Sequence, residues 1–150
     1  MIKILEYQKE HKEIFRKLGE EWISQHFELI DHDLHILADP EGTIISKGGQ
    51  IIFAELDGEI IGTAALVLKP NDRFELAKLG VTEKAKRKGI GRLLTEEIIK
   101  RAKKAGAQSL FLESNRVLKP AILLYEKIGF VEVNPEAKTP QCDIEMKLSL

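Results

Sequence analysis

Val81-Thr-Glu-Lys-Ala-Lys-Arg-Lys-Gly-Ile-Gly-Arg92 joins a β-rich run to a helix through a basic segment and two glycines. The first N–H groups of a helix have no internal partners and carry partial positive charge, and glycines there let a ligand approach the backbone closely. Cations are unfavourable at that end of a helix, so the basic residues around Gly89 and Gly91 predict a bound anion that offsets their charge. A solvated basic loop is the alternative interpretation.

The spacing within this segment narrows the kind of anion. There is no Gly-Lys-Ser/Thr sequence, which excludes a P-loop. A dinucleotide-binding turn places G-x-G-x-x-G/A directly after a strand, whereas Leu94 stands at the third position here and seven residues separate Val81 from Gly89. No aromatic residue interleaves with the basic run, which disfavours a nucleic-acid surface. The pyrophosphate of a soluble cofactor fits the segment better.

Length and composition indicate one water-soluble domain over residues 1–150. The chain has 23 basic and 24 acidic residues and a formal net charge of -1, which weakens an interpretation as a general polyanion binder. Cys142 is the only cysteine, so an intramolecular disulfide is excluded. The charged start lacks the apolar core of a signal peptide, and the longest weakly polar stretch, 60–68, is too short to cross a bilayer. We therefore expect a cytoplasmic protein.

The remaining sequence alternates between strand and helix patterns. Asp57-Gly58 between two β-rich runs predicts a two-residue hairpin. Asp31 is the expected N-cap of a short helix that stops at Asp39-Pro40, and Gly106 and Gly129 are expected to end two later helices. The predicted strands cover 2–6, 51–56, 59–68, 73–81, 109–113 and two runs around a loop at 134–141; the predicted helices cover 8–26, 31–37, 90–105 and 120–128. This order predicts an α/β fold with a mixed central β-sheet flanked by helices on both faces.

The run 73–81 contains an irregularity. Its apolar residues fall at even positions before Lys78 and at odd positions after it, although a strand alternates its faces with a period of two. One extra residue, a β-bulge, would restore the register, and we expect Gly80 to take the distortion most cheaply. A bulge leaves backbone N–H groups unpaired and free to hold a ligand.

Two motifs resemble those of a known family. Lys86-Arg-Lys-Gly-Ile-Gly91 resembles motif A of the GNAT superfamily of acetyl-CoA-dependent N-acyltransferases, with Lys86 in the place of an Arg or Gln. Ala121-Ile-Leu-Leu-Tyr125-Glu-Lys-Ile-Gly129-Phe130 is similar to the second signature of that family, a helix that carries a tyrosine and ends in Gly-Phe. With the hairpin that ends at Gly62, the resemblance spans about residue 51 to the C-terminus.

The resemblance implies a GNAT-like fold, acetyl-CoA as the acyl donor and a set of site residues. It implies that Tyr125 lies near the sulfur atom of the donor as a general acid. Asn115 is the candidate for the cofactor-binding asparagine of the family, although it lies farther upstream of the second motif than is usual. The other implied cofactor-binding residues are Leu79, Gly80 and Val81 at the pantetheine arm, and Lys86, Arg87, Lys88, Gly89, Gly91 and Arg92 at the pyrophosphate.

Amine attack on a thioester needs a base and an acid. Glu75 is the best candidate base, because its apolar strand neighbours face the opposite side of the sheet; the alternative is a solvent-facing or salt-bridged carboxylate. Glu113 is a weaker rival. For Tyr125 the alternative is a helix tyrosine with its ring in the core, which the flanking motif disfavours. Covalent catalysis through Cys142 is not expected, since no histidine lies near it in sequence.

His26, Asp31, His32, Asp33 and His35 form a polar cluster. His32 and His35 are three residues apart and could face one metal ion, but a third ligand at a defined spacing is lacking. An exposed polar turn without metal is the preferred interpretation. In GNAT-like folds this region lies beside the acceptor pocket, so we expect the segment 22–35 to influence substrate choice.

Together these observations predict an N-acetyltransferase that moves the acetyl group of acetyl-CoA directly to a primary amine of a small molecule or peptide. A non-catalytic acyl-CoA sensor is the first alternative. A nucleic-acid-binding module that uses the residues 84–92 is the second, and near-zero net charge disfavours it. We expect no nucleic-acid or membrane partner, and a homodimer through the C-terminal strands is plausible.

Overall fold

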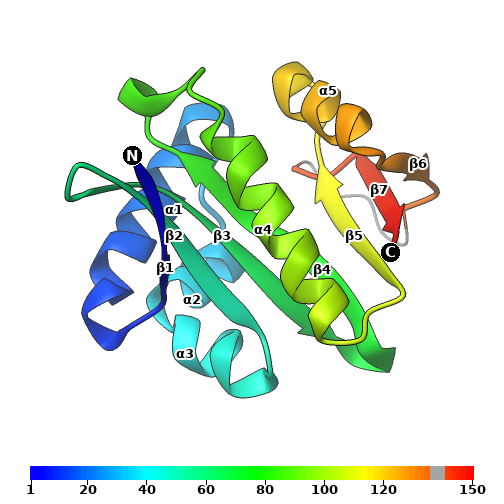
Figure 1. Ribbon diagram of the computed structural model, residues 1–150, viewed down its shortest axis with the longest axis horizontal. Helices are drawn as coiled ribbons and strands as arrows, with labels where there is room; N and C mark the ends of the chain where they lie inside the picture. Colours follow the sequence, from blue (N-terminus) through cyan, green and yellow to red (C-terminus); the bar gives the residue numbers. More distant parts are fainter. Residues whose placement is uncertain (136–140) are drawn as a thin grey trace.

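The computed structural model describes residues 1–135 and 141–150 and has the predicted α/β architecture. Seven strands form one mixed sheet in the order β1-β2-β3-β4-β5-β7-β6, with helices on both of its faces (Figure 1). The strands are β1 (Ile2–Glu6), β2 (Gln50–Leu56), β3 (Glu59–Lys69), β4 (Arg73–Val81), β5 (Ser109–Ser114), β6 (Val131–Val133) and β7 (Ile144–Ser149). The helices are α1 (Lys12–His26), α2 (Asp31–Ala38), α3 (Pro40–Thr43), α4 (Ile90–Lys104) and α5 (Lys119–Ile128), with short 3-10 turns at Lys9–His11, Ile45–Lys47, Pro70–Asp72 and Glu83–Ala85.

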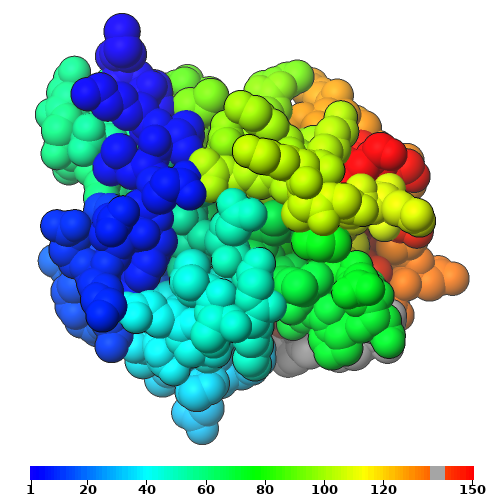
Figure 2. Space-filling view, turned by 60° about the horizontal axis from the view of Figure 1, so that its bottom comes forward, coloured from blue at the N-terminus to red at the C-terminus, as the bar shows by residue number. Residues whose placement is uncertain are grey.

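Apolar residues on alternate positions of the strands build a separate core on each face of the sheet. In β2, Ile52 and Ala54 pack into the core beneath α4 and α5, while Ile51 and Phe53 pack into the core beneath α1 to α3. Figure 2 shows the blue and cyan N-terminal segments gathered on one side of the molecule, bordered by the green turn between β3 and β4. The sheet is therefore buried on both faces along its central strands.

The expected hairpin and helix ends are largely confirmed. Asp57 and Gly58 have φ angles of 51° and 83°, the left-handed pair that a type I′ turn requires. Gly106 follows α4 with a φ of 89°. The N-cap of α2 is Ile30 rather than Asp31, because Asp31 is already the first residue of the helix. Asp39 does end α2, but its side chain then caps α3 by accepting a hydrogen bond from the Gly42 N–H (3.1 Å). Of the loop expected at 134–141, residues 136–140 lie outside the described part of the chain.

The predicted bulge in β4 is present, but Gly80 does not carry the distortion. Thr63 of β3 pairs with Gly80 and Ala65 pairs with Ala77, so two residues of β4 oppose one of β3 between these pairs. Lys78 has the left-handed φ of 54°. The expectation that the glycine would take this conformation is therefore wrong.

Gly80 lies against Trp22 of α1. A Cβ atom at this position would lie 3.4 Å from the side chain of Trp22, which is an ordinary van der Waals contact, so packing against α1 does not require a glycine here.

Strands β4 and β5 are paired only where they begin. They run parallel, and their ladder consists of the pairs Phe74–Leu110 and Glu75–Phe111. Beyond Glu75 the two strands diverge toward the end of the sheet at which α4 begins (Figure 1). Alternate backbone N–H and C=O groups in the second half of β4 consequently have no strand partner on the β5 side.

Among the described residues, no helix combines the length and the apolar character that crossing a membrane would require.

Candidate active site

A cavity of about 400 Å³ lies where β4 and β5 diverge. Residues of α1 and α2 line it on one face of the sheet, and residues of α5 line it on the other. The cavity therefore passes between the two strands and gives access to the middle of the sheet from both faces. We refer to it as the cleft.

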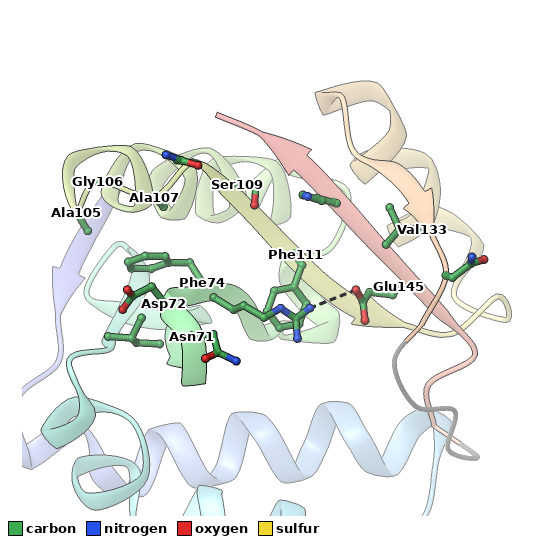
Figure 3. A pocket seen from close by; sticks show the side chains of 15 residues that line it. Asn71, Asp72, Phe74, Ala105, Gly106, Ala107, Ser109, Phe111, Val133 and Glu145 are labelled. Atoms are coloured by element: carbon green, nitrogen blue, oxygen red, sulfur yellow. Dashed lines mark hydrogen bonds and ion pairs between the residues drawn. The ribbon is translucent and has the colours of Figure 1, made fainter.

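A larger cavity, of about 960 Å³, lies where β4 and β5 begin and α4 ends (Figure 3). The Arg73 guanidinium lies over the Phe111 ring, 3.9 Å from its centroid, and a nitrogen of the same group is 3.4 Å from a Glu145 oxygen. None of the site residues expected from the sequence, all of which are described, lines this cavity. The smaller cleft is therefore the candidate active site.

Glu75 lies in the cleft with only 8% of its surface exposed. Burial raises its pKa to about 7; the nearby Lys69 ammonium opposes this rise, and Glu113 adds to it. The Lys69 Nζ atom is 3.7 Å from Oε1 of Glu75. Near neutral pH the carboxylate is thus populated in both protonation states, which suits a group that accepts a proton.

Tyr125 faces the same cleft from α5. Its ring packs edge-on against Phe130, with the ring centroids 5.7 Å apart. Burial raises the pKa of the phenol above its usual value of 10, so Tyr125 stays protonated at physiological pH. The cleft therefore brings together a candidate base and a candidate acid from different elements.

Cys142 and Glu113 also line the cleft. The Cys142 thiol donates a hydrogen bond to Oε2 of Glu113 (3.2 Å). Burial and this contact raise the pKa of the thiol to about 12, so little nucleophilic thiolate forms near neutral pH. This finding supports the expectation that Cys142 does not act covalently.

Positively charged groups at the start of α4 remain available to a ligand. The N-cap of α4 is Gly89, with a φ of 75°, and no side chain of the described residues caps the first N–H groups of the helix. Several basic residues nearby are engaged with acids: Lys84 with Glu59, Lys86 with Glu83 (2.9 Å) and Arg92 with Glu96 (3.5 Å).

Arg87 and Lys88 differ from these basic neighbours. They are exposed and form no ion pair with any residue in the described ranges. Two cations and the uncapped helix start therefore remain available to an anion.

Gly91 lies in the first turn of α4 with no positive φ. A Cβ atom there would meet only the Leu124 side chain, at 3.6 Å, which is an ordinary contact. Neither the backbone conformation nor the internal packing thus requires a glycine at this position. A glycine at this position would, however, let a bound ligand approach the backbone of the helix closely.

The other implied cofactor residues divide into two groups. Leu79 and Gly80 line the cleft, and Val81 leads from them toward the start of α4. Asn115 is buried in the turn between β5 and α5, where its Oδ1 atom accepts a hydrogen bond from the Val117 N–H (3.1 Å). It does not line the cleft, and its role in cofactor binding stays a prediction.

The polar cluster in α2 is only partly the exposed turn expected from the sequence. His32 and His35 are exposed, whereas Asp33 is buried and its Oδ1 atom lies 3.4 Å from Nζ of Lys78. No group of three potential metal ligands occurs in the residues that the structure describes. The phase slip in β4 pointed to Lys78, but the polar residues around Asp33 gave no sign that it is buried.

A comparison with known proteins places this architecture in a family. The family model for Acetyltransferase (GNAT) matches residues 6–130. The chain belongs to this family. The GNAT family consists of acyltransferases, and the resemblance inferred from the two sequence motifs is thereby confirmed.

Individual relatives agree with this assignment. An N-acetyltransferase of Bacillus subtilis (strain 168), YvbK, is 29% identical over 102 residues, which are 66% of this chain and 66% of the relative. The solved structure of a GNAT acetyltransferase from Staphylococcus aureus Mu50 has a TM-score of 0.88 at 22% identity and covers 99% of both chains. An acetyltransferase of Salmonella typhimurium, solved with its cofactor acetyl-CoA, has a TM-score of 0.76 at 17% identity over 99% of this chain and 94% of its own. The likeness to both solved structures shows the GNAT fold.

The buried Glu75 should make the stability of the protein depend on pH. Because its folded-state pKa of about 7 lies above the usual value of 4.5, its contribution to stability is complete below pH 4.5 and is lost as the pH rises through 7. The loss amounts to about 3 kcal/mol of unfolding free energy. Glu75→Gln should remove this loss, so the variant should gain stability relative to the wild type between pH 5 and pH 8 in urea unfolding. Glu21→Gln, at an exposed position of α1 outside the cleft, is the control. If the difference in stability between Glu75→Gln and the wild type stayed the same from pH 5 to pH 8, the assignment would be contradicted.

Proposed function

We propose that the protein transfers the acetyl group of acetyl-CoA directly to a primary amine of a small molecule or peptide. The observation that carries this proposal is that Glu75 and Tyr125 line one cleft, between strands that diverge toward the uncapped start of α4. Acetyl-CoA, when bound, supplies the acetyl group as an activated thioester. The residues of this chain would orient the two reactants and move the protons.

Glu75 is proposed as the base. The attacking amine must lose a proton as its nitrogen forms a bond to the acyl carbon, and a buried carboxylate with a pKa of about 7 accepts that proton near neutral pH. The backbone groups of β4 that lack a strand partner lie along the same cleft. A backbone N–H among them is proposed to donate a hydrogen bond to the thioester carbonyl oxygen as negative charge develops there.

Tyr125 is proposed as the acid. As the carbon–sulfur bond breaks, its phenol donates a proton to the departing sulfur atom. Burial supports this role because it keeps the phenol protonated across the working pH range. Direct attack needs no enzyme nucleophile, which agrees with the raised pKa of Cys142.

The donor is proposed to bind along β4 and across the start of α4. Leu79, Gly80 and Val81 would hydrogen-bond the pantetheine arm through their backbone, and the segment Lys86 to Arg92 would hold the pyrophosphate. Two observations support this arrangement. Arg87 and Lys88 form no ion pair in the described ranges, and neither the backbone conformation nor the packing requires the glycine at position 91. The acetyl-CoA bound to the Salmonella typhimurium relative also supports it.

Thermal unfolding with and without excess acetyl-CoA tests the donor assignment. At one hundred times its Kd, a ligand stabilises the folded state enough to raise Tm by about 5–10 °C for a chain of this size. We expect this shift with acetyl-CoA and not with NAD or ATP. Absence of the shift would refute the donor. A shift without release of thiol in the presence of any amine would instead indicate an acyl-CoA sensor.

Tyr125→Phe tests the acid. Loss of the proton donor should reduce kcat by about 100-fold or more, while the Kd for acetyl-CoA stays within about threefold of the wild type. Steady-state thiol release and calorimetric titration measure the two quantities. Tyr7→Phe is the matched control, because Tyr7 bonds to Glu41 and does not line the cleft. Equal kcat values for both variants would remove Tyr125 from the mechanism.

Gly91→Ala separates ligand binding from folding. Alanine is favoured over glycine within a helix by about 0.5–1 kcal/mol, so this variant should unfold at the same or a higher temperature than the wild type. Its methyl group should nevertheless weaken acetyl-CoA binding by about tenfold or more, because the backbone of α4 is held away from the ligand. Calorimetric titration and thermal unfolding give the two readouts. A variant that is more stable than the wild type and also binds acetyl-CoA more tightly would argue against pyrophosphate binding at the start of α4.

A further inference from the structure

Helix α2 is joined to the sheet by a buried ion pair at the bulge of β4. Asp33 is 5% exposed, and its Oδ1 atom lies 3.4 Å from Nζ of Lys78. Lys78 is itself the residue of the bulge that has the left-handed φ. Both side chains line the cleft that contains Glu75.

The second oxygen of the Asp33 carboxylate has no hydrogen-bond partner among the described residues. Oδ2 is buried, and no donor in the described part of the chain forms a hydrogen bond with it. A buried carboxylate oxygen without a donor is unfavourable, because it has lost its hydration and gained nothing in exchange. Native structures contain few such atoms, and each needs an explanation, of which a functional role is one. Thr82 Oγ1 is also buried without a partner, but Thr82 is uncharged and does not line the cleft.

The same cleft also has an apolar side, formed by the α1 region. Trp22, Ile23 and Phe27 of the α1 region supply apolar lining. Lys69 is paired with Glu75, and within the described ranges the ammonium that contacts Asp33 is that of Lys78, which bonds to Oδ1. An acceptor in the cleft would thus have Glu75 near its reacting nitrogen, apolar side chains for its body, and Asp33 as a second polar contact.

We propose that Asp33 determines acceptor specificity, with Oδ2 accepting a hydrogen bond from a second N–H or O–H group of the substrate. The preferred acceptor is then a small bifunctional amine, a diamine or an amino alcohol, rather than a simple alkyl amine. This inference rests on the proposed acetyl transfer and adds the chemical class of its acceptor. Asp33 is a specificity residue: it binds the substrate away from the bond that forms.

The test uses three matched series of acceptors from propyl to hexyl length: n-alkyl amines, amino alcohols and α,ω-diamines. Thiol release from acetyl-CoA gives kcat/KM for each. A hydrogen bond to a charged group changes a binding constant by about 10- to 100-fold. At the optimal chain length the wild type should therefore prefer an acceptor with a terminal donor over the alkyl amine by about that factor. The amino-alcohol and diamine series then distinguish a hydroxyl from an ammonium as the donor.

Asp33→Asn is the decisive variant. Lys78 should continue to bond to the amide oxygen, which leaves the amide nitrogen in the place of Oδ2 and turns an acceptor into a donor. The preference for bifunctional amines should fall to within about threefold of unity, while kcat/KM for the alkyl amine and the affinity for acetyl-CoA stay near wild type. A purely structural role would lower all three values together. Asp31→Asn, on the exposed side of the same helix and outside the cleft, should retain the preference.

The other outcomes are also informative. A wild type that binds acetyl-CoA but acetylates these amines without preference, or acetylates none of them, would overturn the specificity assignment and leave the donor assignment intact. A wild type that is not stabilised by acetyl-CoA would show that the proposed function itself is wrong. If Asp33→Asn does not fold, the replacement of both partners, Asp33→Leu with Lys78→Met, removes the pair without leaving a buried charge and should abolish the preference.

Discussion

Strands β4 and β5 share two residue pairs and then separate, and their separation creates both walls of the cleft. A ladder that continued along both strands would pair the backbone groups of the second half of β4 with β5 and close the passage between the two faces of the sheet. The apolar cores on the two faces hold the separated strands in place, since β4 is packed from one side by α1 and from the other by α4. The opening thus follows from the packing of the strands between helices on both faces.

The extra residue in β4 determines how the strand contacts a helix beside this opening. A regular strand would send the Lys78 side chain to the face set by its position in the alternation, whereas the left-handed φ lets it reach Asp33 on α2. Two residues farther on, Gly80 lies against Trp22 of α1. The local irregularity therefore connects α2 to the cleft through the pair of Lys78 and Asp33.

The fold could be predicted from the sequence where the cause of a structure is local. The hairpin depends on Asp57 and Gly58 alone, and the bulge is visible as a slip in the apolar alternation around Lys78. The location of the distortion was predicted wrongly: the general preference of glycine for positive φ pointed to Gly80, whereas the positive φ belongs to Lys78, whose side chain pairs with Asp33. That partner lies on a helix far away in sequence.

The features of the candidate site likewise divide into those with a local cause and those that depend on residues distant in sequence. The basic segment and glycines before α4 are contiguous, so their arrangement followed from the sequence, as did the face of β4 on which Glu75 lies. The raised pKa of Glu75 depends on burial and on Glu113 in another strand, neither of which a linear pattern contains. The burial of Asp33 depends on the contact between α2 and the bulge in the same manner.

The short ladder between β4 and β5 also has a consequence for amide hydrogen exchange. It divides the sheet into a part with β1 to β4 and a smaller part with β5, β7 and β6, which only two residue pairs join directly. Helix α4 packs against strands of both parts and spans the junction. Opening of the smaller part would release the protons of β6 and β7 while the β2–β3–β4 ladder stays closed. A molecule that filled the cleft would contact both parts at once, so it would slow exchange across the junction as well as in the residues it touches.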